Sequence, residues 1–300
     1  MSSRLLALFA ATVLAAGCAT PAPHSTHTDT AEPQASTAVI HATAAAHDNL
    51  NALAWTQTAI EHDLIYLQTY RDAQARLLQA LADPHWDALG QADRITPVAD
   101  LPPAVILDID ETVLDNSPYQ ARLLKSGGEF NAADWADWCR EERARALPGA
   151  VAFTQFAARH GITVIYISNR PRALDQATLA NLRKAGFPDS GPDALLGLGV
   201  TRKGCTQTGT EKGCRRQLVS ERYRVLMQFG DQVGDFVDIS HNTDAGRREA
   251  VAAYLPWIGT RWFVLPNPTY GSWEAALFNN NWKEPRELRR QQKIDALRNH

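Results

Sequence analysis

Two aspartates, Asp108 and Asp110, follow directly after the apolar run 104–107. Two prolines precede the run, which has the continuous aliphatic pattern of a buried parallel strand. Ligands of open α/β sheets bind outside the carboxyl ends of the strands, so carboxylates placed here face a crevice rather than the core. The simpler alternative is a capped turn into a helix, in which Asp110 or Thr112 accepts backbone N–H groups.

The types and spacing of these carboxyl groups suit phosphoryl transfer. Asp108 would attack phosphorus and form an aspartyl-phosphate, which splits hydrolysis into two easier steps. Asp110 would protonate the leaving alkoxide and then take a proton from the attacking water. Because close carboxylates repel each other and a phosphate, this chemistry requires a divalent cation. Hard oxygen ligands and a bound phosphate suit Mg²⁺.

Polar side chains also follow two later strands that the sequence predicts. The predicted strands are 104–109, 162–167, 225–229 and 262–265; Ser168, Asn169 and Arg170 follow the second, and Asp231 and Asp235 follow the third. Apolar runs that alternate with helical stretches predict a parallel α/β sheet. The recurrence at strand ends favours one site over several unrelated helix caps.

The expected metal ligands come from the first and third strands. They are the Asp108 carboxylate, the Asp110 main-chain carbonyl and Asp231, with phosphate and water completing an octahedron. Asp235 would join them directly or through a water molecule.

Other polar residues would contact the transferring phosphoryl group. Lys212 would supply a positive charge, and the Ser168 hydroxyl and the Asn169 N–H would hold the equatorial oxygens. Thr112 would orient the Asp110 carboxyl group.

The chain resembles the class C acid phosphatases, the outer-membrane lipoprotein 5′-nucleotidase group of the haloacid dehalogenase (HAD) superfamily. The similarity covers roughly residues 50–282, and Glu111 and Asp115 point to class C within the superfamily. The matching segments are Asp-Ile-Asp-Glu-Thr-Val-Leu-Asp-Asn-Ser at 108–117, Leu-Pro-Gly-Ala-Val at 147–151, Ser-Asn-Arg at 168–170, Lys212 with Arg215, Gly-Asp-Gln-Val-Gly-Asp-Phe at 230–236 and Leu-Pro-Asn-Pro-Thr-Tyr-Gly-Ser-Trp at 265–273.

The resemblance implies a fold and an activity. The fold would be a phosphatase domain over 48–300, with a Rossmann-like α/β core at about 100–270. A smaller, mainly helical lobe would come from 49–90, parts of 113–148 and the C-terminus. The activity would be a Mg²⁺-dependent hydrolysis of phosphomonoesters, nucleoside 5′-monophosphates and aryl phosphates among them.

Several side chains are assigned through the resemblance. Lys212 is preferred over its rival Lys203 because it begins the helix that carries Arg215, as the family's lysine does. Tyr270 and Trp135 would stack on a substrate ring, although core packing is an equal alternative for Trp135. Arg170 would contact the substrate, directly or by pairing with a carboxylate on the rim.

The N-terminus has the features of an export signal. One arginine precedes an apolar run, 5–16, that is too short to cross a bilayer, which takes about 20 residues. Small residues before Cys18 resemble a bacterial lipobox, so 1–18 would be a lipoprotein signal peptide with Cys18 lipidated. Ordinary cleavage with an unmodified Cys18 remains the alternative. Residues 19–47 carry few large apolar side chains and would form a disordered tether to the cell envelope, with an outer-membrane location expected.

The remaining cysteines fit an exported protein. Cys205 and Cys214 flank a polar, glycine-containing segment and are expected to form a disulfide in an oxidising compartment. A zinc site would need two more soft ligands, and none lies nearby in the sequence. Cys139 is expected to be a buried thiol.

Charge and composition exclude some partners and leave others open. The formal charge of −3 gives no basic footprint for a nucleic-acid polymer. The expected partners are a small phosphomonoester and, through the lipid anchor, a membrane; a homodimer stays open. A phosphotransferase that uses the same intermediate is one alternative function, and a surface lipoprotein that scavenges haem or another cofactor is a second.

Overall fold

The computed structural model describes residues 48–189 and 191–299. The expected signal peptide, Cys18 and the tether therefore lie outside the described residues. Among the helices of the described part, none combines the length and apolar character that crossing a membrane requires.

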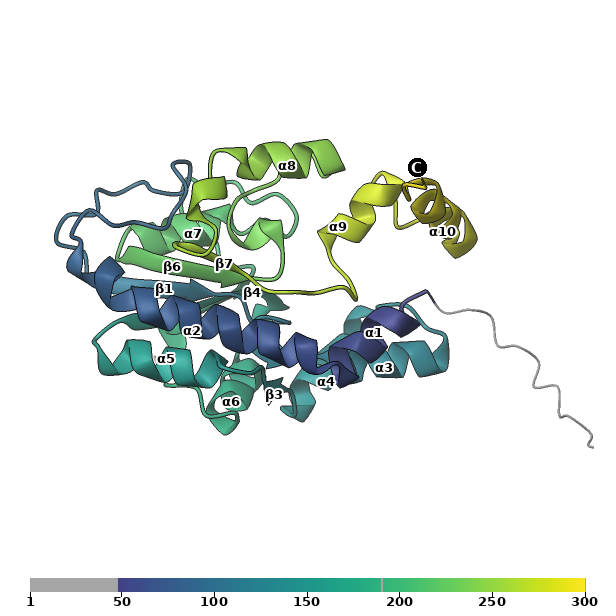
Figure 1. Ribbon diagram of the computed structural model, residues 1–300, viewed down its shortest axis with the longest axis horizontal. Helices are drawn as coiled ribbons and strands as arrows, with labels where there is room; N and C mark the ends of the chain where they lie inside the picture. Colours follow the sequence, from purple (N-terminus) through teal and green to yellow (C-terminus); the bar gives the residue numbers. More distant parts are fainter. Residues whose placement is uncertain (1–47, 190, 300) are drawn as a thin grey trace, which may run out of the picture. The chain divides into compact units, whose positions relative to one another are not determined.

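A five-stranded parallel sheet organises the structure (Figure 1). Its order is β5–β4–β1–β6–β7, with β1 spanning Pro103–Leu107, β4 Thr163–Pro171, β5 Leu195–Leu198, β6 Arg224–Gly230 and β7 Trp262–Val264. The predicted α/β class is confirmed, and the four predicted strands are present with small shifts at their ends. The edge strand β5 was not predicted, because its four residues include a glycine and resemble a loop.

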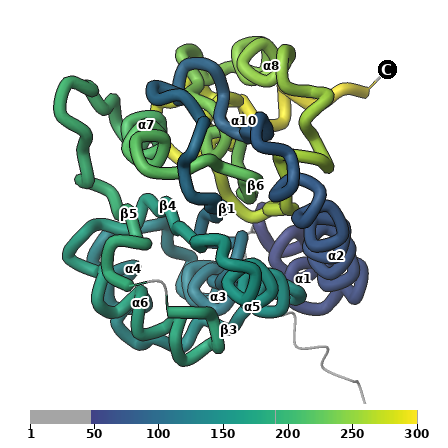
Figure 2. Tube along the Cα trace, turned by 90° about the vertical axis from the view of Figure 1, so that its left-hand side faces the viewer, coloured from purple at the N-terminus to yellow at the C-terminus, as the bar shows by residue number. Residues whose placement is uncertain are grey.

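Helices connect the strands, and a short antiparallel pair lies beside the sheet. The helices are α1 (Leu50–Thr58), α2 (Ile60–Ala82), α3 (Ser117–Ser126), α4 (Ala132–Glu141), α5 (Ala150–Arg159), α6 (Asp175–Lys184), α7 (Gly213–Ser220), α8 (Asp244–Ala252), α9 (Ser272–Ala275) and α10 (Arg286–Asp295). The pair consists of β2 (Leu114–Asp115) and β3 (Arg145–Ala146). Between β5 and α7 the chain makes a long excursion away from the sheet (Figure 2).

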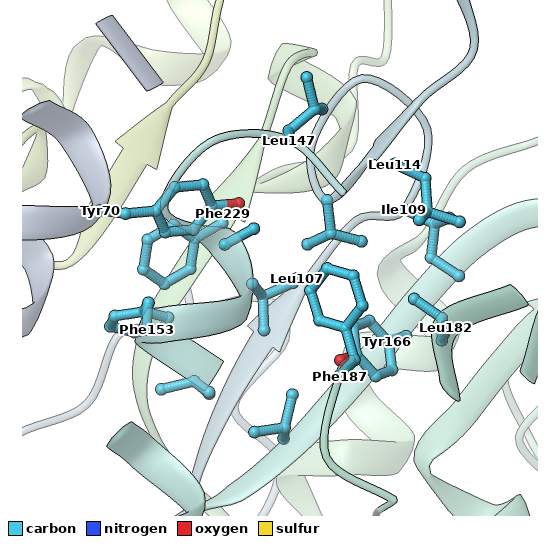
Figure 3. Packing of buried hydrophobic residues seen from close by; sticks show 14 of the residues in the cluster. Tyr70, Leu107, Ile109, Leu114, Leu147, Phe153, Tyr166, Leu182, Phe187 and Phe229 are labelled. Carbon is cyan, nitrogen blue, oxygen red and sulfur yellow. The ribbon is translucent and has the colours of Figure 1, made fainter. Parts of the chain in front are cut away.

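Helix α2 packs on the sheet together with α5, and α7 packs on the opposite face together with Tyr254 and Trp257, which follow α8 (Figure 1). The ring of Tyr70 on α2 stacks on Phe229 of β6 at a centroid distance of 5.3 Å, and Phe153 of α5 contacts both (Figure 3). Burying such a ring stabilises the fold by about 2 kcal/mol. The apolar face of α2, within the range 49–90 expected to contribute to the helical lobe, thus belongs to the core.

Candidate active site

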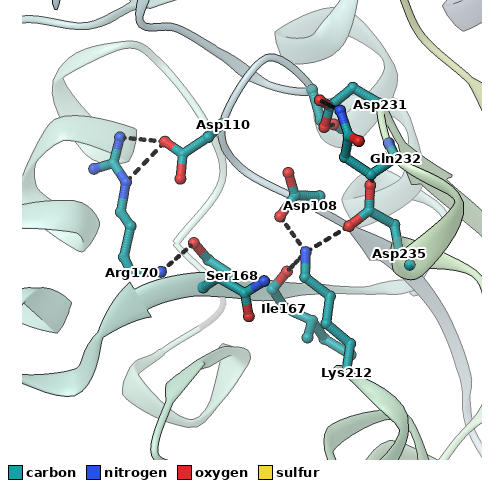
Figure 4. A network of polar contacts seen from close by, with 12 residues as sticks. Asp108, Asp110, Ile167, Ser168, Arg170, Lys212, Asp231, Gln232 and Asp235 are labelled. Atoms are coloured by element: carbon teal, nitrogen blue, oxygen red, sulfur yellow. Dashed lines mark hydrogen bonds and ion pairs between the residues drawn. The ribbon is translucent and has the colours of Figure 1, made fainter. Parts of the chain in front are cut away.

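Asp108 is the first residue beyond β1, and its N–H donates to the Phe229 carbonyl at 3.0 Å. This bond continues the parallel pairing with β6 and fixes the direction in which the side chain leaves the sheet. Asp108 is only 7% exposed, and its carboxylate forms an ion pair with Lys212 (Figure 4).

Lys212 caps the N-terminus of α7 and is buried among acidic and carbonyl oxygens. Its Nζ contacts Asp108 Oδ1, Asp235 Oδ1 at 2.7 Å and the Ile167 carbonyl at 2.8 Å. Burial opposes the charged form, but the two carboxylates outweigh burial and raise the pKa of Lys212. Lys203, the rival in the sequence, is exposed on the excursion between β5 and α7.

Three carboxylates, those of Asp108, Asp231 and Asp235, bring ligand oxygens within 4.8 Å of one another. Burial, followed by the neighbouring carboxylates, raises the pKa of Asp108 well above its ordinary value, and Lys212 offsets only part of this. Burial and Asp235 raise the pKa of Asp231 to about 7. An all-oxygen set that resists ionisation on its own fits a hard divalent cation, which would stabilise the charged forms.

The loop after β6 holds the two later aspartates. Asp231 Oδ2 accepts from Gln232 Nε2 at 2.8 Å and from Asn267 Nδ2 at 2.9 Å, while Asp235 Oδ2 accepts from the Gln232 N–H at 2.8 Å. A Cβ at Gly230 would lie 2.3 Å from the Asp235 side chain, so only glycine lets the loop close over this carboxylate.

Residues other than the expected Thr112 hold the Asp110 carboxylate. Its Oδ1 accepts from Arg170 Nε at 2.9 Å, Arg170 Nη2 at 2.7 Å and Asn116 Nδ2 at 2.8 Å (Figure 4). Thr112, expected to orient Asp110, instead donates to Asp231 Oδ1 at 3.4 Å. Thr112 points toward the residues that follow β6 because the turn after Asp110 reverses the chain.

Arg170 pairs with a carboxylate, which is one of the two alternatives expected for it. Its residue exposure is 2%, and its guanidinium is occupied by Asp110, Asn116 and Thr178. The carboxylate that Arg170 contacts is that of Asp110.

The end of β4 presents Ser168 and Asn169 beside Asp108. Ser168 is fully buried and its Oγ accepts from the Arg170 N–H at 3.1 Å, which leaves its proton free to donate. Asn169 Oδ1 accepts from Arg215 Nη2 at 2.7 Å, so its amide NH₂ points away from Arg215. Arg215, buried with carbonyl and amide partners, also donates to the Ser168 carbonyl at 2.6 Å and thereby ties α7 to β4.

Two tyrosines of α2 support the turn that carries the aspartates, and sequence reasoning missed them. The Tyr66 hydroxyl donates to the Glu111 carbonyl, and the Tyr70 hydroxyl donates to the Thr112 carbonyl at 2.8 Å. Glu111 has a φ of +56°, a conformation that these bonds help to hold. The spacing of four between the tyrosines was the available signal, since it places both on one face of the helix.

The two aromatic residues expected at the substrate have different surroundings. The Tyr270 hydroxyl contacts Glu111 Oε2, next to the aspartate turn. Trp135 packs edge-on against Tyr119 at 5.0 Å between ring centroids and lies under the Arg170 guanidinium. Core packing thus accounts for the contacts of Trp135 that the structure describes.

Cys205 and Cys214 form a disulfide between the excursion and the first turn of α7, and Cys139 is a buried free thiol. The disulfide is anchored two residues after Lys212. It therefore restrains the segment that delivers Lys212 to Asp108.

The chain matches a family model and a solved structure. The model of the acid phosphatases of HAD superfamily subfamily IIIB matches residues 24–273. The class C acid phosphatase of Bacillus anthracis, solved with tungstate bound, is 33% identical at a TM-score of 0.72, over 84% of this chain and 97% of that chain.

Curated plant relatives match a shorter part. Acid phosphatase 1 of Solanum lycopersicum is 28% identical over 165 residues, 55% of this chain and 57% of the relative. The stem 28 kDa glycoprotein of Glycine max is 26% identical over 165 residues, 55% and 58% of the two chains. The chain thus spans little more than half the length of these relatives. The family match covers most of the chain, and the chain belongs to the acid phosphatases of HAD superfamily subfamily IIIB.

Proposed function

We propose that the protein hydrolyses phosphomonoesters through a phosphorylated Asp108. The observation that carries this proposal is the arrangement around Asp108, where Lys212 contacts the carboxylate and Asp231 and Asp235 lie beside it. Family membership supports it, as do relatives named acid phosphatases. The tungstate of the Bacillus anthracis structure is a tetrahedral oxyanion, which supports a phosphate site in this fold.

The reaction would have two steps. An Asp108 oxygen attacks phosphorus while the bond from phosphorus to the ester oxygen breaks, and Asp110 donates a proton to the departing oxygen. Asp110 then takes a proton from water, whose oxygen attacks the aspartyl-phosphate. The bond to Asp108 breaks, which releases phosphate and restores the carboxylate.

The surrounding residues would stabilise charge on the transferring group. Lys212 contacts the nucleophile Asp108. The Ser168 hydroxyl and the Asn169 amide would donate to the equatorial oxygens of the transferring phosphoryl group. Asp108, Asp231 and Asp235 would hold Mg²⁺, together with the Asp110 carbonyl. The ion would supply charge neutralisation that lets these carboxylates and the phosphate approach one another.

Nucleoside 5′-monophosphates and aryl phosphates are the proposed substrates, because Tyr270 places an aromatic ring next to the aspartate turn. A panel of phosphomonoesters at mildly acidic and neutral pH would test this. Equal rates for ring-bearing and ring-free esters would contradict it. Measuring phosphate and alcohol together separates hydrolysis from transfer to a second alcohol.

The function itself is tested with Asp108→Asn and with Asp137→Asn as a control on an exposed carboxylate of α4. Asp108→Asn should lose turnover. Its melting temperature should stay unchanged or rise, since a buried acid is replaced by a neutral amide. Asp137→Asn should match the wild type. Turnover that persists in Asp108→Asn would overturn the assignment, and full activity in excess chelator would overturn the metal requirement.

We further propose that the protein is exported and anchored in the cell envelope through Cys18. The Cys205–Cys214 disulfide supports an oxidising compartment. Metabolic labelling with a radioactive fatty acid should mark the wild type and not Cys18→Ser; equal labelling of both would contradict the anchor.

A further inference from the structure

We propose that Arg170, Asn116 and Trp138 are positioning residues that assign acid–base chemistry to one oxygen of Asp110, Oδ2. This inference rests on the proposed phosphatase reaction and extends it. It concerns a connected set of buried donors to Asp110, of which Arg170 lies on the side of Asp110 away from the carboxylate cluster (Figure 4).

The two oxygens of Asp110 have different surroundings. Oδ1 accepts three N–H groups, two from the Arg170 guanidinium and one from the Asn116 amide, at 2.7 to 2.9 Å. Oδ2 accepts no hydrogen bond from any residue that the structure describes. An oxygen that already accepts three donors, two of them charged, has no lone pair left for a proton. Oδ2 is therefore the oxygen of Asp110 that the hydrogen bonds leave available to a substrate or a water molecule.

The donors are themselves held in place. Trp138 Nε1 donates to Asn116 Oδ1 at 2.8 Å, and Arg170 Nη2 donates to the same oxygen at 3.2 Å. With its carbonyl oxygen facing two donors, the Asn116 amide must turn its NH₂ toward Asp110. Arg170 is further fixed by Thr178, to which Nη1 donates at 3.3 Å. Trp138 thus acts on Asp110 through Asn116, without touching the reacting atoms.

Three separate elements supply this set, and all three side chains are shielded from water. Arg170 is the next-to-last residue of β4, Asn116 precedes α3, and Trp138 lies on α4, with residue exposures of 2%, 0% and 3%. Since water does not compete for these hydrogen bonds, they restrict the carboxylate of Asp110 to one rotamer. The segment 113–148 consequently contributes to catalysis through α4.

The chemical consequence is a dependence on the leaving group. An alkyl ester leaves as a strongly basic alkoxide and needs the proton from Oδ2 during bond cleavage. A nitrophenyl ester leaves as a stabilised anion and needs it far less. Loss of the positioning should therefore reduce alkyl phosphate hydrolysis selectively. A merely structural network would reduce both reactions equally.

Trp138→Phe is the sharpest test, because it removes one N–H donor and keeps an aromatic ring in the core. Its matched control is Trp86→Phe, which removes a partly buried hydrogen bond of 2.8 Å from Trp86 Nε1 to the Leu226 carbonyl, remote from Asp110. We expect kcat/KM of Trp138→Phe to fall about 10-fold for an alkyl phosphate and less than about 3-fold for a nitrophenyl phosphate. In Trp86→Phe, kcat/KM should change by the same factor for both esters.

Arg170→Lys is the second variant, since it keeps the charge and removes the fork that holds Oδ1. We expect a selective loss for the alkyl ester of about 100-fold. If the wild type is active and the variants lose kcat/KM by the same factor for both esters, the positioning role is overturned and the proposed function stands. A wild type inactive toward both esters would overturn the proposed function and the positioning with it.

Discussion

The Tyr70 hydroxyl offers a direct measure of how strongly α2 supports the aspartate turn. Tyr70→Phe removes the donor to the Thr112 carbonyl at 2.8 Å and leaves the ring stacked on Phe229. That carbonyl has no other partner among the described residues, and Thr112 is fully buried. Leaving a buried acceptor unsatisfied costs about 1–3 kcal/mol, so the free energy of unfolding should fall by about 2 kcal/mol.

Tyr166→Phe is the matched control within the same core cluster. Tyr166 is as buried as Tyr70, but its hydroxyl has no hydrogen-bond partner in the described part of the chain. Removing it relieves the cost of burying an unpaired polar group, so the unfolding free energy should stay constant or rise by up to about 1 kcal/mol.

The assay is urea or thermal unfolding of both variants beside the wild type, followed by kcat. A difference of about 2 kcal/mol corresponds to about 4–8 °C in the melting temperature of a domain of this size. Tyr70→Phe should also reduce kcat, because the turn that carries Asp108 and Asp110 loses a tether. Equal destabilisation in both variants would refute the reasoning, since packing rather than the hydrogen bond would then explain the loss.

Two further predictions concern the segment before α7. Burial and the neighbouring Asp238 raise the pKa of Glu211 from 4.5 to about 7, so the folded state holds this proton more tightly than the unfolded state. Stability should therefore fall as pH rises from about 4.5 through 7. Because Glu211 is half-exposed, solvent screening reduces its effect on the free energy of unfolding. Urea titrations at pH 5 and 8 should show that Glu211→Gln loses about 1 kcal/mol less of this free energy between the two pH values than the wild type does. An unchanged pH dependence would contradict this. Reduction of the Cys205–Cys214 disulfide, or its replacement by serines, should lower the free energy of unfolding by about 2–3 kcal/mol. It should also lower kcat, because the segment that places Lys212 beside Asp108 is then less restrained. A reduced protein with unaltered melting temperature and kcat would contradict the second prediction.

The strands and the residues at their ends could be predicted from the sequence, because a buried parallel strand is a continuous apolar run. Asp108, Ser168 and Asp231 follow such runs and meet at one sheet edge. The edge strand β5 could not be predicted, since it is short and only partly buried. Lys212 could be chosen over Lys203 because the start of a helix marks it.

The orientation of the side chains could not be predicted in the same way. Thr112 is two residues from Asp110, yet it contacts Asp231, while Arg170 contacts Asp110 from 60 residues away and Asn116 from 6. Those pairings depend on how the turn after β1 reverses and on where α4 packs. Neither leaves a periodic pattern, and the apolar surface of α2 gives no sign of which carbonyl its tyrosines reach.

The central claim is that Asp108 carries the phosphoryl group during turnover. The most direct measurement is an acid quench of the protein with a nitrophenyl phosphate and Mg²⁺ within one turnover, followed by mass spectrometry of its peptides. The structure predicts a phosphate on Asp108 that disappears as turnover completes and is absent from Asp108→Asn. Steady turnover without a phosphorylated residue, or with the phosphate on another residue, would contradict the claim.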